Sequence, residues 1–234
     1  MYYPMYYFDP TYFLVLIGVV ICLLASAKMN ATFSKYSRVR SYSGMTGREA
    51  AEQVLHQAGI YDVRVEHVSG NLTDHYDPRS KVLRLSDATY NSTSVAALGV
   101  AAHECGHAIQ HATGYAPLKF RSTLVPVANF GSQIAWPLII LGLMFSNGSY
   151  SLLLNLGIFA FSMAVLFQLV TLPVEFNASN RAIRILAGNG MLHEEEVRHT
   201  RKVLTAAALT YVASAASAIL QLLRIVLIAN RRRD

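Results

Sequence analysis

Four long apolar runs constrain the fold of this 234-residue chain more than any other feature. The runs are 12–27, 126–145, 151–173 and 203–229. The first three contain no charged side chain, and the fourth is interrupted only by Gln221 and Arg224. An α-helix of about 20 apolar residues matches the thickness of a bilayer. We therefore expect a mostly α membrane protein with about four transmembrane or apolar helices and a small α+β domain.

The composition agrees with a membrane protein. Hydrophobic residues make up 53% of the chain and charged residues only 15%, whereas a soluble domain has about 25% charged residues. The net charge is +6, but the basic residues adjoin the apolar runs and are not interleaved with aromatic residues as in nucleic-acid-binding patches. Membrane lipid is therefore the expected partner, and nucleic acid is not.

The basic residues also predict the orientation of the first run. No Lys or Arg precedes it, whereas Lys28, Lys35, Arg38 and Arg40 follow. A signal peptide needs a positive charge before its apolar stretch, so this run reads as a membrane anchor. Because cytoplasmic flanks carry the positive charge, the N-terminus is expected outside and the chain after residue 28 in the cytoplasm.

The second and third runs read as a helical hairpin with a tight turn at 147–150. Lys119 and Arg121 precede the hairpin, and Arg181 and Arg184 follow it. Both of its ends are therefore expected in the cytoplasm. The fourth run is basic on both sides, so its charges do not orient it. It is either a fourth membrane helix or a helix packed on the protein at the cytoplasmic surface.

Most of the polar residues lie between the first two runs. Thr46 and Glu49 have the spacing of a helix capping box, and Gly59 follows the end of that helix. Segments 63–68 and 81–86 alternate apolar and polar residues as strands do. A long helix is expected from about Ser92 to His111.

These patterns divide the chain into five parts. They are a membrane anchor (1–30), a cytoplasmic α+β domain (31–125), a transmembrane hairpin (126–173), a helix with a basic segment (174–202) and a C-terminal apolar helix with a basic tail (203–234).

The sequence HECGH at 103–107 has the pattern H-E-x-x-H inside the long helix. Residues four apart lie on one helix face, so His103 and His107 can bind one Zn²⁺. Glu104 then lies beside the metal and can take a proton from a zinc-bound water. Cys105 lies about 200° round the helix from each histidine, and it is expected to face away. With Cys22 it forms neither a disulfide framework nor a metal-binding motif.

The third ligand must come from elsewhere in the chain. His111 is too far along the helix, because eight residues rise about 12 Å. Glu175 follows the hairpin, which returns the chain to the side on which the motif lies. The rival carboxylates of Glu194–Glu196 are instead expected at the exposed start of a helix.

Several segments together resemble the bacterial YugP-like neutral zinc metallopeptidases. They are LTDHYDPRSKVLRLS, SVAALGVAAHECGHAIQH, LPVEFNASNRA and AAALTYVA. The resemblance implies a bacterial membrane protein with a zincin-like catalytic domain, one Zn²⁺ per chain on His103 and His107, and Glu104 as the base. Analogy with gluzincins such as the CAAX prenyl endopeptidases adds Glu175 as the third ligand.

Gluzincins often carry an Asp four residues after that glutamate, where it orients a ligand histidine. Here the position holds Ser179, and the neighbouring Asn180 is an alternative. The predicted activity is zinc-dependent hydrolysis of a peptide or protein substrate on the cytoplasmic side of the membrane. Arg181, His75 and Tyr76 are candidates to stabilise the oxyanion. Strand 81–86 is a candidate to pair with an extended substrate.

Two other functions remain open at this stage. The first is a non-catalytic membrane scaffold stabilised by zinc, or a chaperone-like interaction protein, but structural zinc sites have four protein ligands, and only three are found. The second is a transporter, but transporters place polar groups within their spans, and the first three runs have almost none. The oligomeric state is open.

Overall fold

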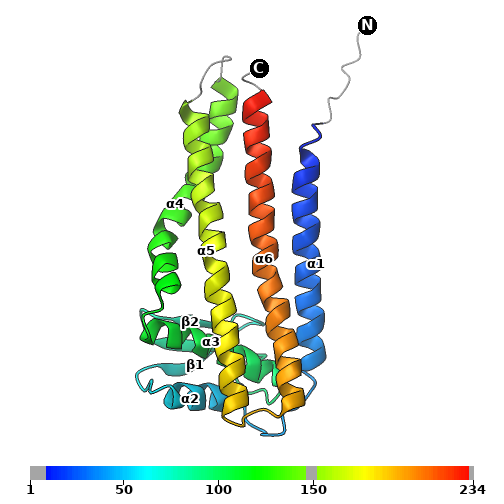
Figure 1. The fold of residues 1–234 in the computed structure, drawn as a ribbon, viewed down its shortest axis with the longest axis vertical. Coiled ribbons are helices and arrows are strands. Elements are labelled where there is room, and N and C mark those ends of the chain that lie inside the picture. The colour runs from blue at the N-terminus through cyan, green and yellow to red at the C-terminus, as the bar shows by residue number, and fades with distance from the viewer. Residues whose placement is uncertain (1–8, 146–151, 232–234) are drawn as a thin grey trace. The chain divides into compact units, whose positions relative to one another are not determined.

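The computed structural model describes residues 9–145 and 152–231. In chain order, the elements are α1 Tyr12–Tyr36, α2 Gly47–Gln57, β1 Arg64–Val68, β2 His75–Asp77, β3 Val82–Ser86, α3 Val95–Ala112, α4 Ala116–Phe145, α5 Leu152–Gly188 and α6 Glu194–Arg231 (Figure 1). Helices α1, α4, α5 and α6 are long and apolar enough to cross a membrane. The predicted fold class, a mostly α membrane protein with a small α+β domain, is confirmed. The turn predicted at 147–150 lies outside the described residues.

The long helices extend well beyond the apolar runs. Helix α5 passes through Pro173 and continues to Gly188, so the third run and the stretch around Glu175 form one helix. Likewise, α6 begins at Glu194 and includes the fourth run, which has the length and hydropathy of a membrane span. Proline is tolerated inside membrane helices because neighbouring groups satisfy the freed backbone carbonyl. Consequently, Glu175 is held on a long, continuous helix.

The contacts group the chain into two compact units. One comprises the described parts of 1–24, 123–169 and 212–234, and the other comprises 25–122 and 170–211. We call the first the helical unit and the second the motif unit, because 103–107 lies in it. The five-part division drawn from the sequence stays a prediction.

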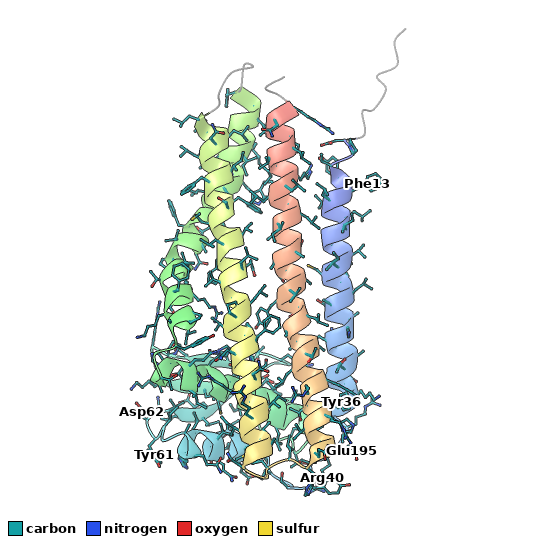
Figure 2. The ribbon with its side chains drawn as sticks, viewed as in Figure 1. Phe13, Tyr36, Arg40, Tyr61, Asp62 and Glu195 are labelled. Atoms are coloured by element: carbon teal, nitrogen blue, oxygen red, sulfur yellow. The ribbon has the colours of Figure 1, made fainter. Side chains whose placement is uncertain are left out.

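In the helical unit, small residues allow close packing of helices. A Cβ added to Gly142 would lie 2.5 Å from the backbone nitrogen of Leu154, and one added to Gly131 would lie 2.9 Å from the carbonyl oxygen of Ala160. Such close approach of α4 and α5 is typical of membrane helices. Large apolar side chains point outward, as Phe13 does at 56% exposure (Figure 2). This unit therefore has the surface expected of a lipid-facing bundle.

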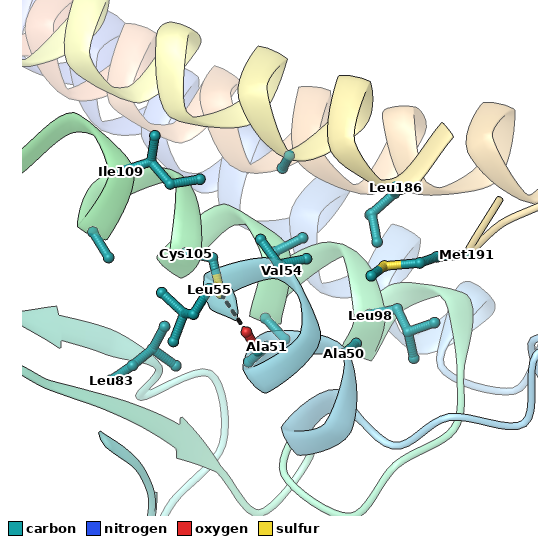
Figure 3. Close-up of a cluster of buried hydrophobic side chains, with 14 of the residues drawn as sticks. Ala50, Ala51, Val54, Leu55, Leu83, Leu98, Cys105, Ile109, Leu186 and Met191 are labelled. Atoms are coloured by element: carbon teal, nitrogen blue, oxygen red, sulfur yellow. Dashed lines mark hydrogen bonds between the residues drawn. The ribbon is translucent and has the colours of Figure 1, made fainter. Parts of the chain in front are cut away.

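The core of the motif unit lies where α2, α3, the sheet and the end of α5 meet (Figure 3). Fully buried alanines of α2, such as Ala51, pack against α3. The predicted capping box at Thr46 and Glu49 is confirmed, and α3 begins after its N-cap Ser94. Cys105 is buried, and its thiol donates to the carbonyl of Ala51 at 3.5 Å. The motif cysteine thus packs into the core, as expected from the helix geometry.

The sheet has the strand order β1-β3-β2, with β1 parallel and β2 antiparallel to β3. Strand β2 was not predicted, since three residues are too few to show an alternating pattern. Strand β3 is the central strand and is largely buried. The prediction that segment 81–86 pairs with an extended substrate is therefore wrong, because both of its edges are already occupied.

Candidate metal centre

His103 and His107 project from one face of α3. Their ring centroids are 4.8 Å apart, and each side chain is 13% exposed. The burial of the opposite face of α3 against α2 fixes the direction in which both imidazoles point.

Glu175 of α5 completes a cluster with these two histidines. Its Oε2 lies 3.3 Å from Nε2 of His103 and 3.5 Å from Nε2 of His107. In a tetrahedral zinc site with bonds of 2.0–2.1 Å, ligand atoms lie about 3.3–3.4 Å apart. The three side chains are therefore spaced as ligands of one ion, and among the described residues they form a cluster that could hold a metal.

Hydrogen bonds to the far side of each imidazole orient the lone pairs. Nδ1 of His107 lies 3.1 Å from Oε1 of Gln110. The amide nitrogen of Gln110 donates to the Val174 carbonyl at 2.8 Å, which fixes the orientation of the amide. The ring must therefore donate through Nδ1 and, when neutral, present the lone pair of Nε2 to Glu175. Nδ1 of His103 lies 3.1 Å from the hydroxyl of Ser179, which can accept the same kind of hydrogen bond.

The charges of the cluster favour a cation. Glu175 is only 2% exposed, and its buried Oε2 has no hydrogen-bond partner of ordinary geometry. Its other oxygen lies 3.7 Å from the guanidinium of Arg121. Burial acts to lower the pKa of His107, but hydrogen bonding to Glu175 and the two nearby carboxylates outweigh it and raise that pKa. A buried acceptor oxygen that faces two ring nitrogens is stabilised by a positive charge between them, and two histidines with one glutamate are a donor set of catalytic zinc sites, so these residues fit zinc.

Gly106 brings the two helices of the cluster together. A Cβ at this position would lie 2.7 Å from the carbonyl oxygen of Ala178 and 3.1 Å from its Cα. Since both atoms belong to the backbone of α5, the contact cannot be relieved by a side-chain rotation. The glycine of HECGH thus sets the distance between the histidines and Glu175.

A Gly106→Ala variant is expected to bind zinc at least about tenfold more weakly and to lose about 1–3 kcal/mol of stability, because overpacking forces α3 and α5 apart. Zinc titration and thermal unfolding measure both effects. Gly188→Ala is the matched control, because no atom lies within 4 Å of its added Cβ. Equal zinc affinity in both variants would show that the close contact at Gly106 does not position the ligands.

Glu104 lies beside the cluster in an open hollow of about 240 Å³. The hollow is lined by Met29, Leu72, Asp74, Val100, His103, Glu104, Leu204, Ala207, Thr210 and Tyr211. Glu104 is 9% exposed, and its side chain forms no hydrogen bond or ion pair with any described residue. Its carboxylate is thus available to a molecule that enters this hollow, which we call the cleft.

Comparison with known proteins agrees with this geometry. A family model described as "Putative neutral zinc metallopeptidase" matches residues 11–230. The chain belongs to this family of zinc metallopeptidases. A curated relative, "Putative membrane protease YugP" of Bacillus subtilis (strain 168), is 48% identical over 222 residues, which cover 95% of this chain and 97% of the relative. No solved structure matches the chain.

The other residues considered for this metallopeptidase site have different contacts. His75 is bonded to the Thr73 carbonyl at 2.8 Å, and the Tyr76 hydroxyl lies 3.1 Å from Nδ1 of His111. Arg181 donates to Asn177 at 2.7 Å. Asn180 lines a second hollow, between α5 and α6. None of these contacts involves His103, His107 or Glu175. An oxyanion role for His75, Tyr76 and Arg181 stays a prediction, as does a role for Asn180 in orienting a ligand histidine.

The rival carboxylates are engaged at the start of α6. Glu194 pairs with Arg198 at 3.4 Å. Glu196 accepts backbone hydrogen bonds from Tyr42 and His193, both at 2.8 Å. These residues open a helix as predicted, but Glu196 is 3% exposed, because the loop after α1 covers it.

Sequence reasoning missed three residues of the site: Gln110, Arg121 and Tyr211. Tyr211 of α6 lines the hollow that contains Glu104 and interacts with both Glu104 and Glu175. The position of Gln110, one turn after His107 on the same face, was the available signal. Arg121 and Tyr211 had no such signal, because the contacts that bring them to the cluster come from other helices.

Proposed function

We propose that this protein is a membrane-bound endopeptidase that uses one zinc ion per chain and cleaves peptide bonds on the cytoplasmic side. The observation that carries this proposal is the spacing of 3.3 and 3.5 Å between the Glu175 oxygen and the two histidine nitrogens, with Glu104 beside them in an open cleft. Three ligands leave a fourth position for water, as in catalytic zinc sites and unlike structural ones.

His103, His107 and Glu175 would hold the ion. Zinc bound there supplies a Lewis acid that lowers the pKa of a water to about 7 and polarises the peptide carbonyl. Glu104 accepts a proton from the attacking water and passes it to the leaving amine. Gln110 keeps His107 in the tautomer that leaves Nε2 free for the metal, and the Ser179 hydroxyl can accept the corresponding hydrogen bond from Nδ1 of His103.

Tyr211 is the best-placed donor for the oxyanion. Its side chain lines the same hollow as His103 and Glu104, and it interacts with the Glu175 carboxylate. A phenol hydroxyl in the hollow that also holds the proposed base can donate to a substrate oxygen that develops negative charge there. We therefore assign Tyr211 to the hydrogen bond that strengthens in the transition state.

A Tyr211→Phe variant is expected to lower kcat about 10²–10³-fold, the usual effect of removing one oxyanion donor. Because the hydroxyl is not a metal ligand, zinc content and KM should change little. Steady-state kinetics with a fluorogenic peptide and zinc analysis of the same sample measure these quantities. Tyr76→Phe tests the rival tyrosine: a loss of kcat there, with none at Tyr211, would overturn the assignment.

The lining of the cleft favours a substrate with an apolar side chain next to the cleaved bond. Five of its ten lining residues are aliphatic or Met: Met29, Leu72, Val100, Leu204 and Ala207. Burial of one leucine-sized side chain contributes roughly 1.5–3 kcal/mol, which is enough to select among peptides.

The orientation of the site follows from sequence charges. Lys28 and Lys35 after the first apolar run, and Lys119 and Arg181 on the two sides of the hairpin, belong to the same unit as the candidate metal cluster. Because positive flanks stay in the cytoplasm, this unit is proposed to face the cytoplasm of a bacterial cell. Cysteine accessibility to a membrane-impermeant reagent at a residue introduced in this unit tests the proposal.

The purified protein should cleave casein or a fluorogenic peptide, lose that activity on chelation and regain it when zinc is restored. Mg²⁺ should not restore it, since imidazole nitrogens suit zinc and Mg²⁺ prefers oxygen ligands. A zinc-loaded, folded protein that cleaves none of a diverse peptide library would favour the scaffold function instead.

A further inference from the structure

A basic groove lies between α1 and the start of α6, apart from the metal cluster. It has a volume of about 560 Å³ and is lined by Lys28, Ala31, Thr32, Lys35, Tyr36, Arg201, Lys202, Thr205 and Ala206. Figure 2 labels Tyr36 at the end of α1. Four of the nine lining residues are cations and none is an acid.

No carboxylate within the described part of the chain forms an ion pair with Lys28, Lys35, Arg201 or Lys202. The positions three and four residues away from each of them along its helix also hold no acid, although such pairs are the usual partners on a helix surface. Lys35 instead lies over the ring of Tyr36, 5.5 Å from its centroid. Four like charges around one hollow repel one another, and a bound anion would remove that repulsion.

The sequence positions of these cations indicate where the anion comes from. Lys28 directly follows the apolar run 12–27, and Arg201 and Lys202 directly precede the run 203–229. Helix α1 runs toward the groove and α6 runs away from it, so the polar ends of two apolar runs meet there. A basic pocket between helices at the cytoplasmic edge of a membrane is suited to a lipid headgroup.

We propose that this groove binds the phosphate headgroup of an anionic phospholipid. The cations supply the charge, and the hydroxyl of Thr205 adds a hydrogen-bond donor. The groove adjoins the cleft that contains Glu104, because the same two helix segments line both. Lys28 lines the groove and the next residue, Met29, lines the cleft. Thr205 and Ala206 line the groove, and their neighbours Leu204 and Ala207 line the cleft. A bound headgroup would thus hold α1 and α6 in the arrangement that forms the cleft. The effect of the lipid on cleavage rests on the proposed peptidase function, whereas binding of the lipid does not.

The test uses the full chain in nanodiscs and in detergent. Wild-type protein transferred from mixed phosphatidylglycerol and phosphatidylcholine into detergent should retain phosphatidylglycerol, as measured by mass spectrometry of the intact complex. A variant with Lys28, Lys35, Arg201 and Lys202 replaced by Gln should retain at least about tenfold less, since each cation contributes to the attraction of an anionic lipid. The control replaces Arg48, Arg64, Arg79 and Arg184, which are exposed and lie outside the groove, and it should retain phosphatidylglycerol as wild type does.

Equal retention by the groove variant and the control variant would overturn the proposal. The proposal of lipid binding would also be wrong if inorganic phosphate or glycerol phosphate at millimolar concentration displaced the lipid fully, because the groove would then recognise a free phosphate. Thermal unfolding and zinc content confirm that each variant is folded. Since lipid retention is measured without any peptide, its failure is distinguishable from failure of the peptidase function.

Discussion

The Glu104→Gln variant is expected to bind zinc like the wild-type protein and to cleave peptides at least about 10³-fold more slowly, within the range for loss of a general base. The substitution keeps the size of the side chain but removes its ability to take a proton. His103, His107 and Glu175 are unchanged, so the metal-binding cluster is retained. The Glu104 side chain forms no hydrogen bond or ion pair with a described residue that the amide would break, and the fold should not suffer.

The measurement compares zinc per chain and kcat/KM in one preparation of each variant. Glu52→Gln is a suitable control, because Glu52 is an exposed carboxylate paired with Arg48 on α2. The control should retain full cleavage. Unchanged cleavage by the Glu104 variant would exclude Glu104 as the base. If a chelator abolished cleavage by neither the wild-type nor the variant preparation, the cleavage would come from a contaminating protease.

The local patterns of the sequence predicted much of this fold. The capping box at Thr46, the strand alternation in 63–68 and 81–86, and the helix carrying HECGH all depend on neighbours within a few residues. Glu175 was found by a different route, from the reasoning that an uncharged hairpin returns the chain to its starting side. It does lie beside both histidines.

The sequence could not predict features that depend on tertiary contacts. Pro126, Pro137 and Pro173 each lie inside a continuous helix, although proline is the least favourable residue in a helix interior, because packing overrides local propensity. The role of Gly106 is likewise invisible in the sequence, since the backbone that excludes a side chain there belongs to another helix. Tyr211 and Arg121 come to the site from helices whose relative rotation no local pattern specifies.

Ser179 illustrates how the resemblance and the structure complement each other. Gluzincins often have an Asp at this position, and the substitution raised the question of what orients His103. The hydroxyl of Ser179 lies 3.1 Å from Nδ1 of His103, so the same position supplies the hydrogen bond with a neutral group. A neutral partner makes the imidazole less basic than a carboxylate would, so a metal bound there would keep more of its Lewis acidity for a substrate.

The second large effect is expected at the metal itself. In a Glu175→Gln variant, the zinc content should fall from one ion per chain to less than about a tenth at micromolar free zinc. Mutation of a residue that only hydrogen-bonds a metal ligand lowers metal affinity about 10–100-fold, and loss of a ligand itself should lower it more. The amide keeps the shape of the buried side chain but removes the charge that balances the ion. Cleavage should fall in proportion to zinc content.

Glu196→Gln is the matched control, because Glu196 is as buried as Glu175, at 3% against 2% exposure, and also belongs to a long helix. Its carboxylate accepts hydrogen bonds from Tyr42 and His193, so its loss should lower stability and leave zinc bound. Metal analysis after dialysis and thermal unfolding separate the two effects. Full zinc retention by the Glu175 variant would remove this residue from the ligands, and zinc loss in the Glu196 variant alone would move the site to the start of α6.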